Sequence, residues 1–229
     1  MNKLKIFMFL LFLGSHFTMT AQTNDEYEYT VKKKKASARK KNKAAVVKAI
    51  TQLKNGGAVI YIVKDRKMKT DAMKEKGFEE KALQLETDRM RKQKIIVKGL
   101  KENFKFCPVY FILQSDLEKI QRGEIAGNLL DTTLKKDATI VFNHSYFLFL
   151  DYGDVYDEQG KVYSDTAKSD LTGRTSLKTD CFVFKNKYMS QLTKPFPYYI
   201  TCHYPAKELG LKMRVLNKRL SAFYAKVAE

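Results

Sequence analysis

The chain has 229 residues, a length that suits one ordinary domain with a tail. Hydrophobic residues make up 44% of it and aromatic residues 12%, and there are only 4 Pro and 11 Gly. This composition can form a sizeable core and excludes collagen-like and wholly disordered proteins. The formal charge of +18 at pH 7 is large enough to attract anionic partners through a long-range field.

The first segment has the features of a secretory signal. Lys3 and Lys5 precede an apolar run at residues 6–13, and Ala21 offers a cleavage point. This run is too short to span a bilayer, which takes about 20 apolar residues. We therefore expect a signal peptide at 1–21, with an uncleaved anchor as the alternative, and no transmembrane span after its removal. The remaining chain, at +16, would belong to the periplasm or cell envelope of a Gram-negative bacterium.

A dense basic cluster lies in the N-terminal segment 22–43, ahead of a single predicted α/β-type globular domain at 44–229. Aromatic residues are not interleaved with its charges and no nucleic-acid motif is present, which argues against specific nucleic-acid binding. Such a cluster suits an anionic envelope surface or polymer, and a solvated helix start is the alternative. The predicted binding residues are Lys32, Lys33, Lys34, Lys35, Arg39, Lys40, Lys41 and Lys43.

The first half of the domain predicts a helix, a strand and a second, long helical stretch. Residues 44–53 have helical spacing and end at a Gly-containing stop, and 58–63 is a continuous β-branched and aromatic run typical of a strand covered on both faces. Residues 68–104 are rich in helix formers, and Gly77 divides them into a short and a long helix. An apolar stripe with a seven-residue spacing marks the long one as a crossover helix, at Leu83, Met90, Val97 and Phe104.

The second half predicts mainly strands and one amphipathic helix. Ser115 and Glu118 match a capping box ahead of a short helix. The last signal is the clearest, because apolar residues between 209 and 227 step by three and four, as in a helix packed on a core. Strands are expected at 107–113, 139–142, 145–150, 181–184 and, at an edge or bend, 196–202, with a hairpin at 155–163 and a long loop at 164–180.

These elements together predict an α+β fold. The expected sheet is mixed and mainly antiparallel, with the long crossover helix and the C-terminal amphipathic helix packed on it.

The cysteines are odd in number, so at least one thiol is unpaired. Cys107 and Cys181 lie in apolar, strand-like runs, where free Cys often acts as a small buried hydrophobe. Burial is the favoured interpretation for them, and a Cys181–Cys202 bridge is the alternative in an oxidising compartment.

Catalytic motifs are absent from the sequence. It contains no phosphate-binding glycine loop, no HExxH and no GxSxG, so it predicts no cofactor and no metal site. The catalytic candidates are the two histidines outside the signal, His144 and His203, with Asp151 and Cys202, provided that the ends of their strands converge. The alternative is that both histidines cap strand ends and that Cys202 belongs to the core.

Three stretches resemble segments of uncharacterised exported proteins of Bacteroidetes-type bacteria. They are residues 104–111, residues 185–199 with the pattern KNKY…QL.KPFPYY, and the signal end Thr20-Ala21-Gln22. The resemblance covers most of the chain from Leu53 to Tyr204 and implies a compartment but no activity, so it assigns no functional residue.

Two classes of function follow. The favoured one is a non-catalytic envelope protein that binds or scaffolds through its basic surface. The alternative is a small periplasmic hydrolase-like enzyme that uses the region of His144, His203 and Asp151.

Overall fold

The computed structural model describes residues 43–65, 67–155 and 180–228. The chain divides into two compact units, Met1–Ala45 and Val46–Glu229. The predicted signal peptide and all of the basic cluster except Lys43 lie outside the described residues, as do the predicted hairpin turn and nearly all of the long loop that follows it.

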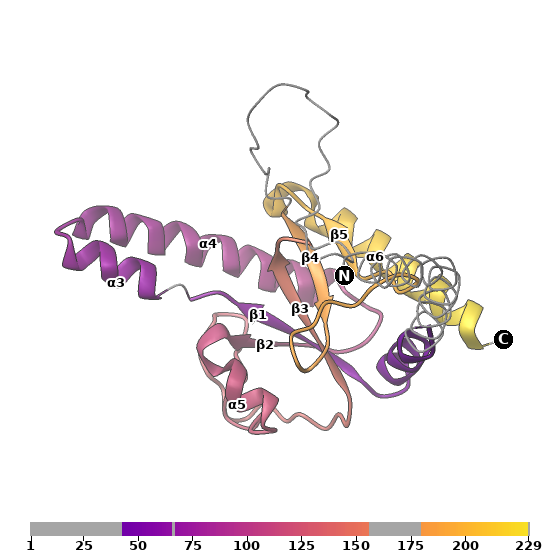
Figure 1. The fold of residues 1–229 in the computed structure, drawn as a ribbon. Helices are drawn as coiled ribbons and strands as arrows, with labels where there is room; N and C mark the ends of the chain where they lie inside the picture. Colours follow the sequence, from indigo (N-terminus) through magenta and orange to yellow (C-terminus); the bar gives the residue numbers. More distant parts are fainter. Residues whose placement is uncertain (1–42, 66, 156–179, 229) are drawn as a thin grey trace, which may run out of the picture. The chain divides into compact units, whose positions relative to one another are not determined.

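The second unit is built on a five-stranded sheet with the order β2-β1-β3-β4-β5 (Figure 1). β1 pairs in parallel with both β2 and β3, whereas β4 pairs antiparallel with both β3 and β5. The α+β class with a mixed sheet is therefore confirmed. The strands are β1 (Ala58–Val63), β2 (Val109–Leu113), β3 (Phe147–Gly153), β4 (Cys181–Lys185) and β5 (Tyr199–Thr201).

Helices connect and cover these strands as the sequence predicts. A helix at residues 43–54 leads into β1, and a helical pair connects β1 to β2 as a crossover. Gly77, with φ +78°, divides this pair at the predicted position, because the left-handed region favours glycine. The labelled helices are α3 (Lys67–Glu75), α4 (Glu79–Asn103), the single 3₁₀ turn η1 (Gln114–Asp116), α5 (Leu117–Gln121) and α6 (Pro205–Ala228).

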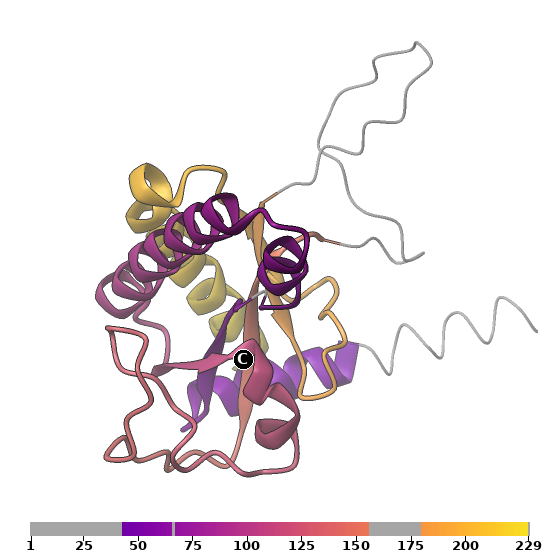
Figure 2. The same cartoon turned by 90° about the vertical axis from the view of Figure 1, so that its left-hand side faces the viewer.

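Both faces of the sheet are covered, so β1 is fully buried as predicted. Tyr61 and Phe182 point to the face where α4 and α6 pack, together with Leu216 of α6. Ile60 and Phe149 point to the opposite face, where α5 packs. Figure 2 shows α4 and α6 on one side of the strands and α5 on the other.

The predicted stripe on α4 is correct only for the C-terminal half of the helix. Val97 and Phe104 are buried, but Leu83 is 63% exposed. A helix of 25 residues is about 37 Å long at about 1.5 Å per residue, whereas a strand of six residues spans about 20 Å. The first half of α4 therefore extends past the strands with α3, as Figure 1 shows.

Two local predictions are wrong because side chains bind the backbone or each other differently. Residues 139–142 are not a strand, since Asp137 accepts hydrogen bonds from the backbone N–H and the hydroxyl of Thr139, which bend the chain locally. The capping box at Ser115 does not form. Asp116 precedes α5 instead, and its buried carboxylate pairs with Lys136 and Lys119 at 2.7 and 3.1 Å.

The contact between α4 and α6 depends on a glycine. A Cβ at Gly99 would lie 2.2 Å from Leu209 Cδ2 and 3.0 Å from Leu209 Cγ. We expect Gly99→Ala to destabilise the protein by about 1 to 3 kcal/mol, because overpacking outweighs the gain of about 1 kcal/mol in helix propensity. Urea unfolding measures this change.

A double-mutant cycle provides the control for this prediction. Leu209→Ala alone should cost about 2 to 5 kcal/mol, because Leu209 is buried. In that background Gly99→Ala should become neutral or stabilising, since the added methyl group fills the space that the leucine leaves. An equal cost of Gly99→Ala in both backgrounds would show that this contact is not the cause.

Candidate functional site at the carboxyl edge of the sheet

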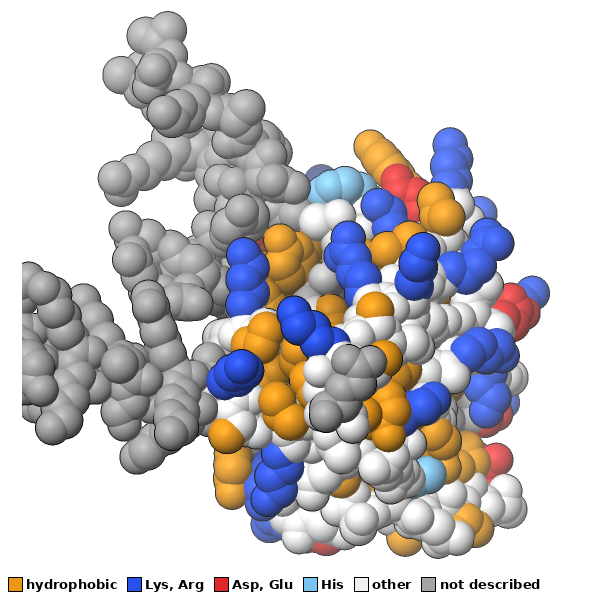
Figure 3. All heavy atoms as spheres, turned by 90° about the vertical axis from the view of Figure 1, so that its right-hand side faces the viewer, with side chains coloured by type: hydrophobic (Ala, Val, Ile, Leu, Met, Phe, Trp, Pro, Cys, Tyr) orange, Lys and Arg blue, Asp and Glu red, His pale blue; other side chains and the backbone are white. Residues whose placement is uncertain are grey.

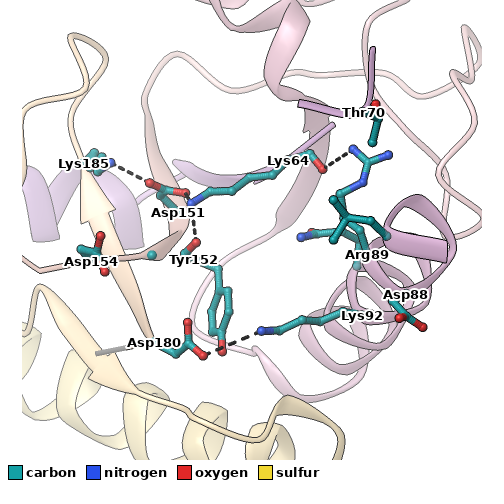
Figure 4. Close-up of a pocket in the computed structure, with 13 residues that line it drawn as sticks. Lys64, Thr70, Asp88, Arg89, Lys92, Asp151, Tyr152, Asp154, Asp180 and Lys185 are labelled. Atoms are coloured by element: carbon teal, nitrogen blue, oxygen red, sulfur yellow. Dashed lines mark hydrogen bonds and ion pairs between the residues drawn. The ribbon is translucent and has the colours of Figure 1, made fainter. Parts of the chain in front are cut away.

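A pocket of about 400 Å³ opens where the carboxyl ends of β1 and β3 meet. The chain leaves β1 on the α4 face, reaches β2, and returns past α5 to β3 on the other side of β1. In open sheets with parallel strands, ligand sites commonly lie at the carboxyl edge where the strand order reverses in this way. The charged residues that line the pocket are Lys64, Asp88, Arg89, Lys92, Asp151, Asp154, Asp180 and Lys185 (Figure 4).

The inner wall holds one carboxylate between two ammonium groups. Lys185 Nζ donates a hydrogen bond to Asp151 Oδ2 at 2.7 Å. Lys64 Nζ lies 3.1 Å from Asp151 Oδ1 as an ion pair and donates its hydrogen bond to the carbonyl of Tyr152 at 2.5 Å. The three side chains are 13 to 21% exposed, so this cluster is largely removed from water.

The local electrostatics keep Asp151 ionised. Burial by itself favours the neutral acid, but Lys64 and Lys185 outweigh it and hold the pKa of Asp151 below its ordinary value of 3.8. The cluster is therefore two cations and one anion at neutral pH.

Glycine at position 153 gives Lys64 its place. A Cβ there would lie 2.9 Å from Lys64 Nζ, closer than such atoms normally approach. A side chain at position 153 would therefore force the ammonium group of Lys64, the mobile end of that side chain, to shift from its place beside Asp151.

Helix α4 supplies the opposite wall. Arg89 donates a hydrogen bond to the carbonyl of Lys64 at 3.0 Å and lies 3.6 Å from Glu86, while its Nε is buried with no acceptor among the described residues. Gln93, one turn further on, accepts a hydrogen bond from the buried hydroxyl of Tyr61 at 2.9 Å. These bonds fix α4 against the end of β1.

Tyr152 closes the floor of the pocket. Its hydroxyl donates to the carbonyl of Cys202 at 2.7 Å, and Lys92 Nζ lies 4.7 Å from the centre of its ring. Burial and the nearby Asp180 raise the pKa of Tyr152, so the phenol stays protonated. The Lys92–Asp180 pair is looser, at 3.8 Å with both side chains 44% exposed.

The structure separates His144 from the other catalytic candidates. His144 precedes β3 and Asp151 lies near its end, seven residues later, which corresponds to about 20 Å of extended chain. Both ring nitrogens of His144 have partners, the hydroxyl of Tyr110 at 3.0 Å and the carbonyl of Gly56 at 2.8 Å. It therefore joins two segments at the amino end of the sheet.

Cys202 and His203 lie at the same edge as Asp151 but do not line the pocket. Burial, with Glu208 adding to it, raises the pKa of the Cys202 thiol to about 11, so the thiolate needed for nucleophilic attack is scarce at neutral pH. His203 is exposed and borders a neighbouring depression of about 280 Å³. Asp151 is thus the one predicted catalytic candidate in the pocket.

The thiols follow the favoured interpretation in part. Cys202 is a free, buried thiol, so the alternative bridge to Cys181 is not formed. Cys181 is buried in β4. Cys107 is a free thiol but only partly buried, at the border of the core, and burial raises its pKa to about 12.

Helix α6 carries a second charged feature, on its outer side. Its buried stripe is formed by Leu209, Met213, Leu216 and Leu220. Figure 3 shows the face of the molecule that includes the C-terminal end of α6. Lys and Arg side chains are spread over this face between apolar patches, and most acidic side chains lie toward its rim. Within the described part of the chain, no acidic group pairs with any of the basic residues of α6, which are Lys207, Lys212, Arg214, Lys218, Arg219 and Lys226.

Comparisons of the chain with protein-family models, curated proteins and solved structures find no match. The resemblance to exported Bacteroidetes-type proteins therefore stays a prediction. Within residues 43–65, 67–155 and 180–228, no group of His, Cys, Asp and Glu has an arrangement that would hold a metal ion. Across the same ranges, no helix combines the length and apolar character needed to cross a membrane.

Proposed function

We propose that this chain is an exported, non-catalytic protein that binds an anionic membrane surface of the cell envelope through basic side chains. The observation that carries the proposal is the charge of its last described segment. Residues 180–228 contain nine Lys and Arg against two Asp and Glu, so they hold most of the basic surplus of the described chain.

The arrangement of α6 supports contact with a surface. Lys207, Arg214 and Lys218 are exposed and step by seven and four, which places them in one row opposite the buried stripe. Leu211 lies in the same row and is 59% exposed. Basic residues around an exposed apolar residue are typical of helices that lie on anionic lipid, where the charges meet headgroups and the apolar side chain enters the interface.

The N-terminal basic cluster at 32–43 supports the same function from the sequence. It follows the predicted signal peptide closely, so export would leave it near the start of the mature chain. Each basic residue near an anionic surface contributes about 1 kcal/mol. Two basic regions together suffice for reversible attachment without a lipid anchor.

Vesicle binding of charge variants tests the proposal. Lys207→Gln, Arg214→Gln and Lys218→Gln together should weaken binding to vesicles with anionic lipid on the order of 100-fold, because about 3 kcal/mol of attraction is lost. Changing the eight basic residues of the N-terminal cluster to Gln should weaken it further. Co-sedimentation at low salt measures both.

A matched control removes the same charge elsewhere. Lys69, Lys74 and Lys94 are exposed on the helical pair α3–α4, and their combined change to Gln alters the net charge equally. This control variant should retain most of the vesicle affinity. Equal losses of vesicle affinity in the α6 variant and the control would show that only net charge matters. Unchanged vesicle affinity in both the α6 variant and the cluster variant would contradict the proposal.

A further inference from the structure

The ammonium groups of Lys64 and Lys185, in the pocket at the carboxyl edge, have N–H donors that no described residue accepts. An ammonium group has three donors. Lys185 uses one, to Asp151, and Lys64 uses one for the carbonyl of Tyr152; even if the ion pair of Lys64 with Asp151 takes up another, donors are left over. Counting contacts within the described ranges only, at least three donors thus remain, on side chains that are only 15 and 21% exposed.

The charges of the inner wall also do not balance. Arg89 has Glu86 as a counter-charge on its solvent side, but Lys64 and Lys185 share the single carboxylate of Asp151. A largely buried surplus of one positive charge is unfavourable unless an anion compensates it. The inner wall of the pocket therefore has both the charge and the donors to hold an anion, whereas the carboxylates of Asp88, Asp154 and Asp180 lie elsewhere in the lining.

The position of these groups is fixed before any ligand arrives. The backbone of Lys64 is held by Arg89, and Gly153 leaves the space that its ammonium group occupies. Preorganised donors lose little entropy on binding, which favours a specific site over loose counter-ions.

We propose that this pocket binds a small polar ligand whose anionic group, a carboxylate or a phosphate, lies between the ammonium groups of Lys64 and Lys185. The volume of about 400 Å³ is within the range of small-molecule sites. Asp154 has no ion-pair partner among the described residues and Asp180 is only loosely paired, so the outer wall offers acceptors. The rest of the ligand accordingly carries hydroxyl or amino groups.

Anion titrations at constant ionic strength test this site. Inorganic phosphate and acetate are the two probes, with chloride replacing them in the reference, and binding is followed by NMR shifts and by the midpoint of thermal unfolding. At least one probe should bind the intact protein saturably, and the stronger of the two identifies the phosphate or carboxylate class. Absence of saturable binding by both would overturn the proposal.

Three variants place the binding at this pocket. Lys185→Gln should lower the affinity for the bound probe by about tenfold or more, through loss of charge-assisted hydrogen bonds. Asp151→Asn should raise the affinity for the probe, because the anion then replaces the missing carboxylate. Gly153→Ala changes no charge but displaces Lys64, so it should weaken binding while the protein remains folded.

The exposed Lys187, two residues beyond Lys185, gives the control. Lys187→Gln should leave the affinity unchanged. If Lys185→Gln is too unstable to measure, the opposite changes in Asp151→Asn and Gly153→Ala decide the outcome. Equal probe affinity in Asp151→Asn, Gly153→Ala and the intact protein would place the anion elsewhere and overturn the proposal.

Discussion

Replacing Phe182 with alanine is expected to lower the free energy of unfolding by about 3 to 5 kcal/mol. Phe182 is fully buried in β4, and its ring centre lies 6.2 Å from that of Tyr61 and 4.9 Å from that of Tyr152. The substitution leaves a cavity between the sheet and the α4–α6 layer and also removes the support of the tyrosine that forms the pocket floor. Urea unfolding, with an unchanged dependence on denaturant, measures the effect.

An exposed aromatic residue of the following turn is the control for Phe182. Tyr188 is 72% exposed, so Tyr188→Ala should change stability by no more than about 0.5 kcal/mol. Comparable losses in the two variants would contradict the assignment of Phe182 to the core.

Asp151→Asn should destabilise the protein by about 3 kcal/mol at neutral pH, because it leaves two largely buried lysines without their carboxylate. The pKa of Asp151 is depressed in the folded state, so its contribution is present above the ordinary carboxyl value of 3.8 and is lost as pH falls through the folded value. The stability gap between the two proteins should therefore narrow in acid.

Chemical unfolding of both proteins between neutral and acidic pH measures this gap. Lys185→Gln is a useful companion, since Asp151 then keeps only Lys64 and its pKa should rise toward the ordinary value. A gap that stays constant down to the lowest pH would show that the ion pairs of Asp151 do not contribute to stability.

Elements whose signal lies within a single segment could be predicted from the sequence. β1 is one apolar run and α6 one periodic stripe, and both form close to the expected bounds. The pairing of the strands was harder to predict from the sequence. Ile60 is in register with Tyr110 on one side and Phe149 on the other, and no local pattern encodes such distant partners. The exposure of Leu83 has the same origin, since it depends on where the sheet ends.

The pocket could be predicted only in part. Asp151 directly follows the apolar run expected as a strand at 145–150, and it was a candidate on the condition that strand ends converge; in the structure it lies inside β3, near its carboxyl end. Lys64 follows β1 and Lys185 is the last residue of the antiparallel strand β4, but single lysines in so basic a chain resemble solvated charges. Only the three-dimensional structure shows that both lysines contact the carboxylate of Asp151. His144 was grouped with Asp151 because the two are close in sequence, but the strand β3 between them places them at opposite ends.

The salt dependence of vesicle binding tests the central proposal most directly. Attraction between exposed basic residues and anionic lipid decays over a Debye length of about 8 Å at physiological salt and about 3 Å at 1 M. The intact protein should bind vesicles with anionic lipid at low salt, leave them as salt rises toward 1 M, and bind neutral vesicles weakly throughout. Equal binding to both lipids, or binding to anionic vesicles that does not change with salt, would contradict attachment through the basic surface.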